Sequence, residues 1–274
     1  MLLALNVNNT NTVIALYPFQ NGRVGELRIT WRISTRQAQT ADEYGILVRN
    51  LLEGEGVKTA DITGIVIASV VPPIDWILRT FCERYFAQKP VFIEPGVKTG
   101  LPIRTDNPAE AGADRIANCV GAYETYGGPC IVVDFGTATN FDVISSKGEF
   151  LGGAIAPGLI ISAEALFARA ARLPRVEIKR PAKVIGTNTV DNLQVGLFYG
   201  HIGLVDSILE RMIGELGTDT KCVATGGLSH LVANDSKYIT HINDTLTLEG
   251  LRIIYERHRA AKARSNPEDS AAKA

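Results

Sequence analysis

The sequence predicts an α/β protein built from two related halves. Apolar stretches with strand patterns alternate along the chain with amphipathic stretches of helical period. Residues 3–16 and residues 131–144 both read as strand, polar turn and strand, and they superpose without a gap. Such a repeat indicates a duplicated domain, although any two β-hairpins share part of this pattern. We expect a first domain over residues 1–126, a second over 127–258 and a disordered tail over 259–274.

Strands and helices alternate in the first half. An apolar run stops in the polar turn of residues 8–12 and then resumes. Thr40, followed by Glu43 three residues later, forms a capping box ahead of apolar residues that share one helical face. A proline pair ends the buried strand of residues 65–71. The remaining expected elements are a helix over 74–86, a strand over 90–94 and a proline-led helix over 107–128.

The second half repeats this alternation. Its first segment is the second strand-turn-strand unit, and a later strand ends in a pair of glycines. The expected elements are a hairpin over 130–144, helices over 159–172 and 189–215, a strand over 222–227 and a closing helix over 248–263.

Composition and charge exclude several classes of protein. With 46% hydrophobic and 21% charged residues, the 274-residue chain can bury one large or two medium cores. A formal net charge of −1 gives no bulk attraction to nucleic acid. The scattered cysteines fit reduced thiols. No stretch approaches the roughly 20 apolar residues of a membrane span, and no signal peptide is visible. We therefore expect a cytoplasmic protein without nucleic-acid or membrane partners.

Two polar turns and a glycine-rich turn indicate a nucleotide. A turn of Gly, Thr and Asn can point several backbone N–H groups at phosphate oxygens. The second hairpin has Gly136 and Thr137, preceded by Asp134, whose carboxylate can hold a phosphate-neutralising cation. Residues 224–228 could receive a base or ribose. Taken singly, each turn is better explained as an ordinary β-turn, and only the three together favour nucleotide binding. Neither a P-loop nor a dinucleotide-binding glycine motif is present.

The stretch Gly-Ala-Asp-Arg indicates phosphoryl-transfer chemistry. Asp114 lies near an expected helix start and could accept a proton from an alcohol that attacks a phosphoryl group. Arg115 could bind an anionic substrate. The same pair is also explained by an aspartate that complements a helix dipole beside a surface arginine.

A series of short motifs runs in order from Met1 to about Tyr255. They are Asn9-Thr10-Asn11-Thr12, Ser69-Val70-Val71-Pro72, Asp106-Asn107-Pro108, Gly112-Ala113-Asp114-Arg115, Asp134-Phe135-Gly136-Thr137-Ala138-Thr139, Gly152-Gly153-Ala154-Ile155-Ala156-Pro157-Gly158, Gly186-Thr187-Asn188-Thr189, Ala224-Thr225-Gly226-Gly227-Leu228 and Leu246-Thr247-Leu248-Glu249-Gly250-Leu251. By these motifs the chain resembles the type III pantothenate kinases, a family of the actin/hexokinase/Hsp70 superfamily.

The resemblance implies an activity and a fold. The activity is ATP-dependent phosphorylation of pantothenate to 4'-phosphopantothenate, the first step of coenzyme A biosynthesis. The fold is a pair of actin-like, ribonuclease H-like domains, each a mixed sheet flanked by helices. The resemblance further implies a homodimer with active sites at its interface, and a need for Mg²⁺ and for K⁺ or NH₄⁺.

The same resemblance assigns roles to residues. Asp114 would be the proton acceptor, Asp134 would hold the monovalent cation, and Asn6 would lie at a weakened Mg²⁺ site. The implied pantothenate-binding residues are Gly112, Ala113, Asp114, Arg115, Thr105 and Thr189. In the family's arrangement, Thr189 would reach across the dimer interface. The implied ATP-binding residues are Asn6, Asn8, Asn9, Thr10, Asn11, Thr12, Thr137, Gly226 and Gly227.

Some positions depart from the family's pattern. Relatives usually read Asp-Val-Gly-Asn-Thr where this chain has residues 6–10, and the second hairpin keeps that Asp and Gly. Asn6 therefore lacks a charge that helps to hold Mg²⁺. Asn8 places a side chain where glycine allows positive φ and close phosphate approach. Thr105 replaces a usual Tyr, and Asn140 a usual Thr.

These departures leave alternatives open. The chain could be an active pantothenate kinase of reduced rate, or a catalytically impaired homologue that acts as a ligand-binding, partner or regulatory protein. A phosphatase or a kinase of another small alcohol is a third reading. The retained Asp114, Arg115 and Asp134 favour the active enzyme.

Overall fold

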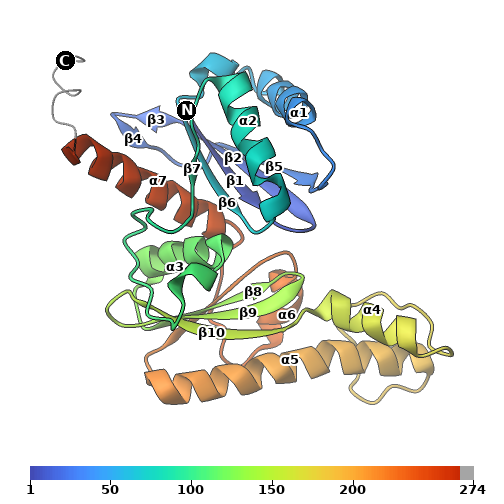
Figure 1. The fold of residues 1–274 in the computed structure, drawn as a ribbon. Helices are drawn as coiled ribbons and strands as arrows, with labels where there is room; N and C mark the ends of the chain where they lie inside the picture. Colours follow the sequence, from blue (N-terminus) through green and yellow to red (C-terminus); the bar gives the residue numbers. More distant parts are fainter. Residues whose placement is uncertain (266–274) are drawn as a thin grey trace. The chain divides into compact units, whose positions relative to one another are not determined.

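The computed structural model describes residues 1–265, which fold into two compact units. The first unit comprises residues 1–101, residues 106–121 and residues 247–265. The second comprises residues 102–105 and 122–246. Figure 1 shows that each unit contains a sheet and helices.

The first unit contains a five-stranded mixed sheet in the order β5-β2-β1-β6-β7. Its strands are β1 (Leu2–Val7), β2 (Asn11–Tyr17), β5 (Ile29–Ser34), β6 (Gly64–Ser69) and β7 (Val91–Phe92), and a small hairpin pairs β3 (Phe19–Gln20) with β4 (Arg23–Val24). Strands β2 and β5 run antiparallel to their neighbours, whereas β6 lies parallel to β1. The helices are α1 (Ala41–Gly54), α2 (Asp75–Phe86), the start of α3 (Ala113–Tyr126) and nearly all of α7 (Leu246–Ser265). Short 3₁₀ turns lie at Thr59–Asp61, Pro72–Ile74 and Pro108–Glu110.

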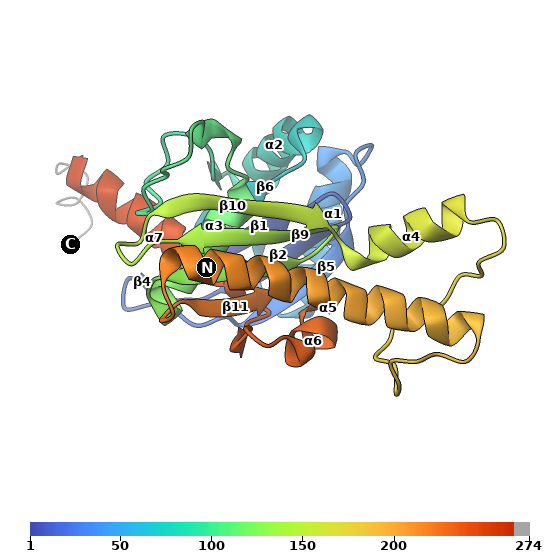
Figure 2. The same ribbon diagram turned by 90° about the horizontal axis from the view of Figure 1, so that it is seen from below.

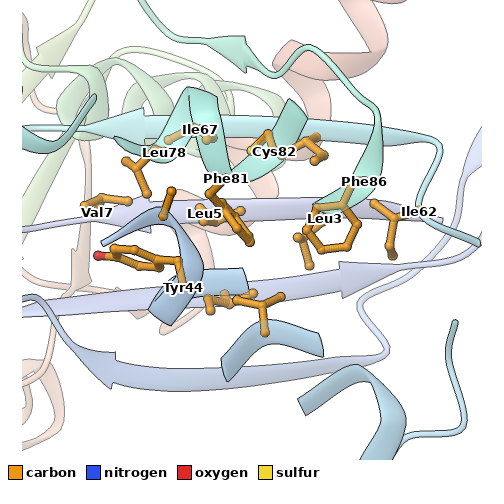
Figure 3. Close-up of a cluster of buried hydrophobic side chains, with 14 of the residues drawn as sticks. Leu3, Leu5, Val7, Tyr44, Ile62, Ile67, Leu78, Phe81, Cys82 and Phe86 are labelled. Atoms are coloured by element: carbon orange, nitrogen blue, oxygen red, sulfur yellow. The ribbon is translucent and has the colours of Figure 1, made fainter. Parts of the chain in front are cut away.

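The core of the first unit lies between the sheet and helices α1 and α2. The predicted capping box is present: the Thr40 hydroxyl accepts from the Glu43 amide at 3.2 Å, and the Thr40 amide donates to the Glu43 carboxylate at 2.7 Å. From this start, α1 buries one apolar face. Figure 3 shows Tyr44 of α1 and Phe81 of α2 packed beside alternate residues of β1, such as Leu5.

The second unit repeats the first strand for strand. Its sheet has the order β10-β9-β8-β11-β12, formed by β8 (Cys130–Phe135), β9 (Ala138–Ile144), β10 (Phe150–Pro157), β11 (Lys221–Thr225) and β12 (His241–Ile242). The helices are α4 (Leu159–Arg169), α5 (Thr189–Leu216) and α6 (Ser229–Val232), followed by a 3₁₀ turn at Ala233–Asp235. Because both sheets combine antiparallel and parallel neighbours in the same order, the predicted fold class, a pair of actin-like domains, is confirmed.

The two hairpins differ by one residue in their turns. Val7 pairs with Thr12 across the first turn, which leaves four residues in the loop, 8–11. Phe135 pairs with Thr139 across the second, which leaves three, 136–138. The gap-free superposition is therefore wrong after the turn: Thr12, rather than Asn11, corresponds to Thr139. An extra loop residue shifts the second strand without changing the first.

Other elements also differ from expectation. The strands β5 and β10 were not predicted, although Ile29–Ser34 alternates half-buried and exposed side chains as an edge strand should. The glycines of Phe150–Pro157 weaken its strand signal. The expected helix over 107–128 is interrupted, because Asn107 caps only a 3₁₀ turn and α3 begins at Ala113.

The C-terminal segment differs as well. Helix α7 continues to Ser265, so residues 259–265 of the expected tail are helical, and residues 266–274 lie outside the described residues. Residues 247–258 belong to the first unit, although they were expected in the second domain, residues 127–258. No helix within residues 1–265 is long and apolar enough to cross a membrane.

Candidate active site

Asn6 lies near the end of β1, where the first unit's polar turn begins. Its side chain is only 8% exposed, and its paired neighbours are Val13 on β2 and Ala68 on β6. The Asn6 Oδ1 atom is buried and accepts no hydrogen bond from the residues that the structure describes. A buried acceptor left without a partner costs about 1–3 kcal/mol. This oxygen therefore fits a bound ligand, such as a metal ion or its water, although an amide brings no charge.

The turn after Asn6 is held by backbone and hydroxyl contacts. The Asn8 amide donates to the Asn11 carbonyl at 3.1 Å, and the Thr35 amide donates to the Thr10 carbonyl at 3.0 Å. The buried Thr12 hydroxyl lies 2.9 Å from that of Thr35. The tips of the turn, Asn9 and Thr10, are exposed. Both residues are therefore accessible to a phosphate.

The turn shows no backbone strain at Asn8. Neither Asn8 nor Gly136, its counterpart in the second hairpin, has a positive φ. A Cβ on Gly136 would meet the Ala138 carbonyl at 3.6 Å and the Asp134 carboxylate at 3.7 Å, which are ordinary contacts. The turn keeps to conformations open to any residue, so backbone conformation gives no reason for glycine at this position.

Asp114 and Arg115 open helix α3, as the sequence predicts. The Arg115 amide donates to Asp114 Oδ1 at 2.8 Å. A Cβ on Gly112 would lie 2.8 Å from the same oxygen, so glycine makes room for the carboxylate. Burial raises the pKa of Asp114, and the adjacent backbone hydrogen bond and the Arg115 charge oppose that rise. A carboxylate with a raised pKa is a better proton acceptor, which is what an attacking alcohol requires.

In the second unit, the glycine-rich turn lies directly against Asp134. Strand β11 pairs with β8 so that Thr225 lies opposite Asp134. Gly226 has φ +92°, and a Cβ there would lie 2.4 Å from Asp134 Oδ1 and 2.7 Å from the Phe135 nitrogen. Asp134, Thr137, Gly226 and Gly227 therefore gather at one end of this sheet. Because Gly226 has no side chain, the Asp134 carboxylate has room beside it.

Substituting Gly226 by Ala is expected to displace the Asp134 carboxylate, because the added methyl group has no room and the φ is unfavourable. Under the roles that the resemblance assigns to these residues, we expect about a tenfold rise in the KM for ATP and a weaker response to monovalent cations. Steady-state kinetics at varied K⁺ checks this result. Gly196→Ala is the matched control, since a Cβ at that helical position meets nothing within 4 Å. Equal kinetics for the two variants would contradict the expectation.

Two further predicted residues belong to the second unit. Thr189 is the first residue of α5 and is exposed; the Asn188 side chain caps this helix by accepting from the Asp191 amide at 3.0 Å. Thr105 is partly buried, and its Oγ1 has no hydrogen-bond partner among the described residues. Within residues 1–265, no three His, Cys, Asp or Glu side chains cluster as a metal site.

The family model for type III pantothenate kinase matches residues 2–211. A type III pantothenate kinase from Acidobacterium capsulatum is 73% identical over 266 residues, which cover 97% of this chain and 98% of the relative. The chain belongs to the type III pantothenate kinase family. Another member, from Koribacter versatilis, is 60% identical over 265 residues, covering 95% of this chain and 97% of the relative.

One solved structure supports the fold of this type III pantothenate kinase family member. A Campylobacter jejuni protein assigned to the Baf family of transcriptional activators matches with a TM-score of 0.56. The match covers 97% of this chain and 98% of that one at 20% sequence identity. At that identity the similarity concerns the fold alone. Members of the pantothenate kinase family use ATP, which fits the two polar hairpins.

Sequence reasoning missed a buried polar pair behind the second turn of this family member. Thr139 Oγ1 lies 3.2 Å from His201 Nε2, and the two side chains are 0% and 6% exposed. Burial lowers the pKa of His201, so the ring is neutral at pH 7 and serves as a packing and hydrogen-bonding group. A histidine inside an otherwise apolar helical face was the available signal. The sequence could not identify its partner.

Proposed function

We propose that this chain catalyses the ATP-dependent phosphorylation of pantothenate to 4'-phosphopantothenate, the first step of coenzyme A biosynthesis. The observation that carries the proposal is Asp114, a partly buried carboxylate of raised pKa at the start of α3, in a chain that belongs to this family. In the proposed step, the pantothenate hydroxyl oxygen attacks the γ-phosphorus and the bond to ADP breaks. Asp114 takes the hydroxyl proton.

The remaining residues bind and orient in this proposal. Arg115 pairs with the pantothenate carboxylate, and the Gly112–Ala113 backbone lies beside the substrate. The two hairpins and the Gly226–Gly227 turn bind ATP through backbone N–H groups. Mg²⁺ near Asn6 and K⁺ or NH₄⁺ at Asp134 would neutralise phosphate charge when bound. Thr105 and Thr189 complete the pantothenate contacts. A place in the cytoplasm, where ATP is available, is part of the same proposal.

The test is the reaction itself. Purified protein is mixed with ATP, Mg²⁺ and pantothenate, and 4'-phosphopantothenate is measured by mass spectrometry alongside ADP release. We expect turnover that K⁺ or NH₄⁺ supports better than Na⁺. A panel of other small alcohols is the control for substrate identity. Absence of phosphopantothenate in every cation would refute the proposal, and preference for another alcohol would correct it.

A homodimer is the proposed assembly, with Thr189 reaching the partner's site. Its support is the second unit's apolar surface, where large hydrophobic side chains are exposed on β10, on α4, in the segment before α5 and at the start of α5. These side chains are Leu151, Ile155, Ile160, Ile161, Leu166, Val184, Ile185 and Val190. Figure 2 shows α4 beside α5, with both extending beyond the strands of their own unit. A second copy would cover such a surface.

Replacing Ile155 by Glu is expected to dissociate this dimer, because a charge would then be buried against apolar side chains. Ile155 is 65% exposed in the single chain, so the folded unit tolerates the change. Sedimentation velocity should shift from about twice the 29.6 kDa chain mass to one chain mass. Ile46→Glu, at a half-exposed position on α1, is the control that stays dimeric. A wild-type protein that sediments as a monomer would refute the assembly.

A further inference from the structure

The motif of residues 246–251 has a structural role that the proposed reaction leaves unassigned. It forms the first turn and a half of α7, and two of its residues contact α3. The Thr247 hydroxyl donates a hydrogen bond of 2.5 Å to the Asn118 Oδ1 atom. Asn118 is 0% exposed and Thr247 is half-buried, so this bond is partly shielded from water.

Gly250 makes the second contact. A Cβ at Gly250 would lie 1.8 Å from the Ala117 carbonyl oxygen and 2.5 Å from its carbon. These distances are far shorter than any side chain permits, so the backbones of α7 and α3 touch here only because residue 250 has no side chain. The contact therefore fixes how closely the two helices approach.

Both contacts lie one helical turn beyond Asp114. Ala117 and Asn118 follow Asp114 by three and four positions, which places them on the same face of α3. The hydrogen bond to Asn118 and the backbone contact with Ala117 together fix the rotation of α3 about its axis and its shift along that axis. The direction of the Asp114 side chain depends on both of these quantities.

We infer that Thr247 and Gly250 are positioning residues that hold the first turn of α3, and with it the Asp114 carboxylate, in its reactive orientation. The inference rests on the proposed role of Asp114 as proton acceptor. A small displacement of a reacting group can cost about a hundredfold in rate, even when its cause lies away from the chemistry. The motif therefore acts on turnover through α3 rather than through contact with either substrate.

The test compares Thr247→Val with Thr247→Ser in the full chain. Val keeps the shape of Thr but cannot donate to Asn118, whereas Ser restores the hydroxyl. We expect Val to lower kcat about tenfold with the KM for ATP changed less than twofold, and Ser to return kcat to within about threefold of wild type. The Gly250→Ala variant is less suitable, because its clash with Ala117 can prevent folding.

Two further measurements separate positioning from general stability. Thr40→Val removes the α1 cap and is the matched control: it should lower the melting temperature while leaving kcat unchanged. In protein without nucleotide, hydrogen–deuterium exchange over residues 113–118 should rise in Thr247→Val and stay at wild-type level in Thr40→Val. The inference is overturned if Thr247→Val melts lower yet keeps its kcat and its exchange pattern, or if Ser behaves as Val does. If wild-type protein does not phosphorylate pantothenate, the proposed function fails. Hydrogen–deuterium exchange tests the positioning claim separately, because an unchanged exchange pattern in Thr247→Val would overturn that claim by itself.

Discussion

Replacement of Asp114 by Asn is expected to lower the kcat for pantothenate phosphorylation by about 10²–10⁴-fold, the usual contribution of a positioned proton acceptor. The amide keeps an oxygen that can accept from the Arg115 amide, as Asp114 Oδ1 does at 2.8 Å, so the start of α3 should be unchanged. What the variant loses is the ability to take the proton. Single-turnover kinetics, together with calorimetric binding of pantothenate, separates chemistry from affinity. A variant that keeps more than a tenth of wild-type kcat would exclude Asp114 as the base.

The same variant carries a prediction on pH and stability. Burial raises the folded-state pKa of Asp114, so the folded protein holds this proton more tightly than the unfolded chain does. Stability from this group is therefore complete below the unfolded value of about 3.9 and is lost as pH rises through the raised pKa. The amide of Asp114→Asn does not ionise, so this variant does not lose stability in this way as the pH rises. We expect it to melt higher than wild type at pH 7 to 8 and to lose the advantage below about pH 4.

The acid limb of the wild-type rate should report the same group. Because the reaction needs the ionised carboxylate, kcat should fall as pH drops through the raised pKa, at a higher pH than an ordinary Asp would give. A rate profile that stays flat down to about pH 4, combined with equal melting of the two proteins at pH 7, would contradict the assignment.

The second large effect on activity is expected from placing a carboxylate at position 6. Two unit charges 4 Å apart interact by roughly 4 kcal/mol at an effective dielectric of about 20, and about 1.4 kcal/mol is already tenfold in rate. We therefore expect Asn6→Asp to raise kcat/KM for the Mg²⁺ complex of ATP about tenfold. Without metal, the variant should melt lower than wild type, because the side chain at this position is 8% exposed and its Oδ1 has no partner among the described residues. Adding Mg²⁺ and ATP should recover more stability in the variant than in wild type.

Asn8→Gly is the matched control for this experiment. Since neither hairpin has a positive φ at this position, removing the Asn8 side chain should change kcat/KM less than about twofold. An Asn6→Asp variant with wild-type kinetics and an unchanged thermal response to Mg²⁺ would show that the amide oxygen serves as well as a carboxylate. A large gain from Asn8→Gly alone would point to side-chain obstruction of the phosphates.

Several features could be predicted because their causes are local. The Thr40–Glu43 capping box and the polar turns after β1 and β8 each depend on residues that lie close together in the sequence. The alternation of strand and helix follows from hydrophobic period in the same way. The strand β10 was missed because its glycines carry no β signal, although pairing with β9 stabilises it.

By itself, the sequence determined the fold class, the duplication, the family and the identity of the residues expected to act. The tertiary structure decided how those residues are supported. Gly226 lies against Asp134 because β11 pairs with β8, and Thr247 contacts Asn118 because α7 packs on α3. It also decided that the turn at Asn8 is unstrained. Such contacts join segments far apart in the chain, and they depend on strand register and helix approach, which hydrophobic periodicity does not encode.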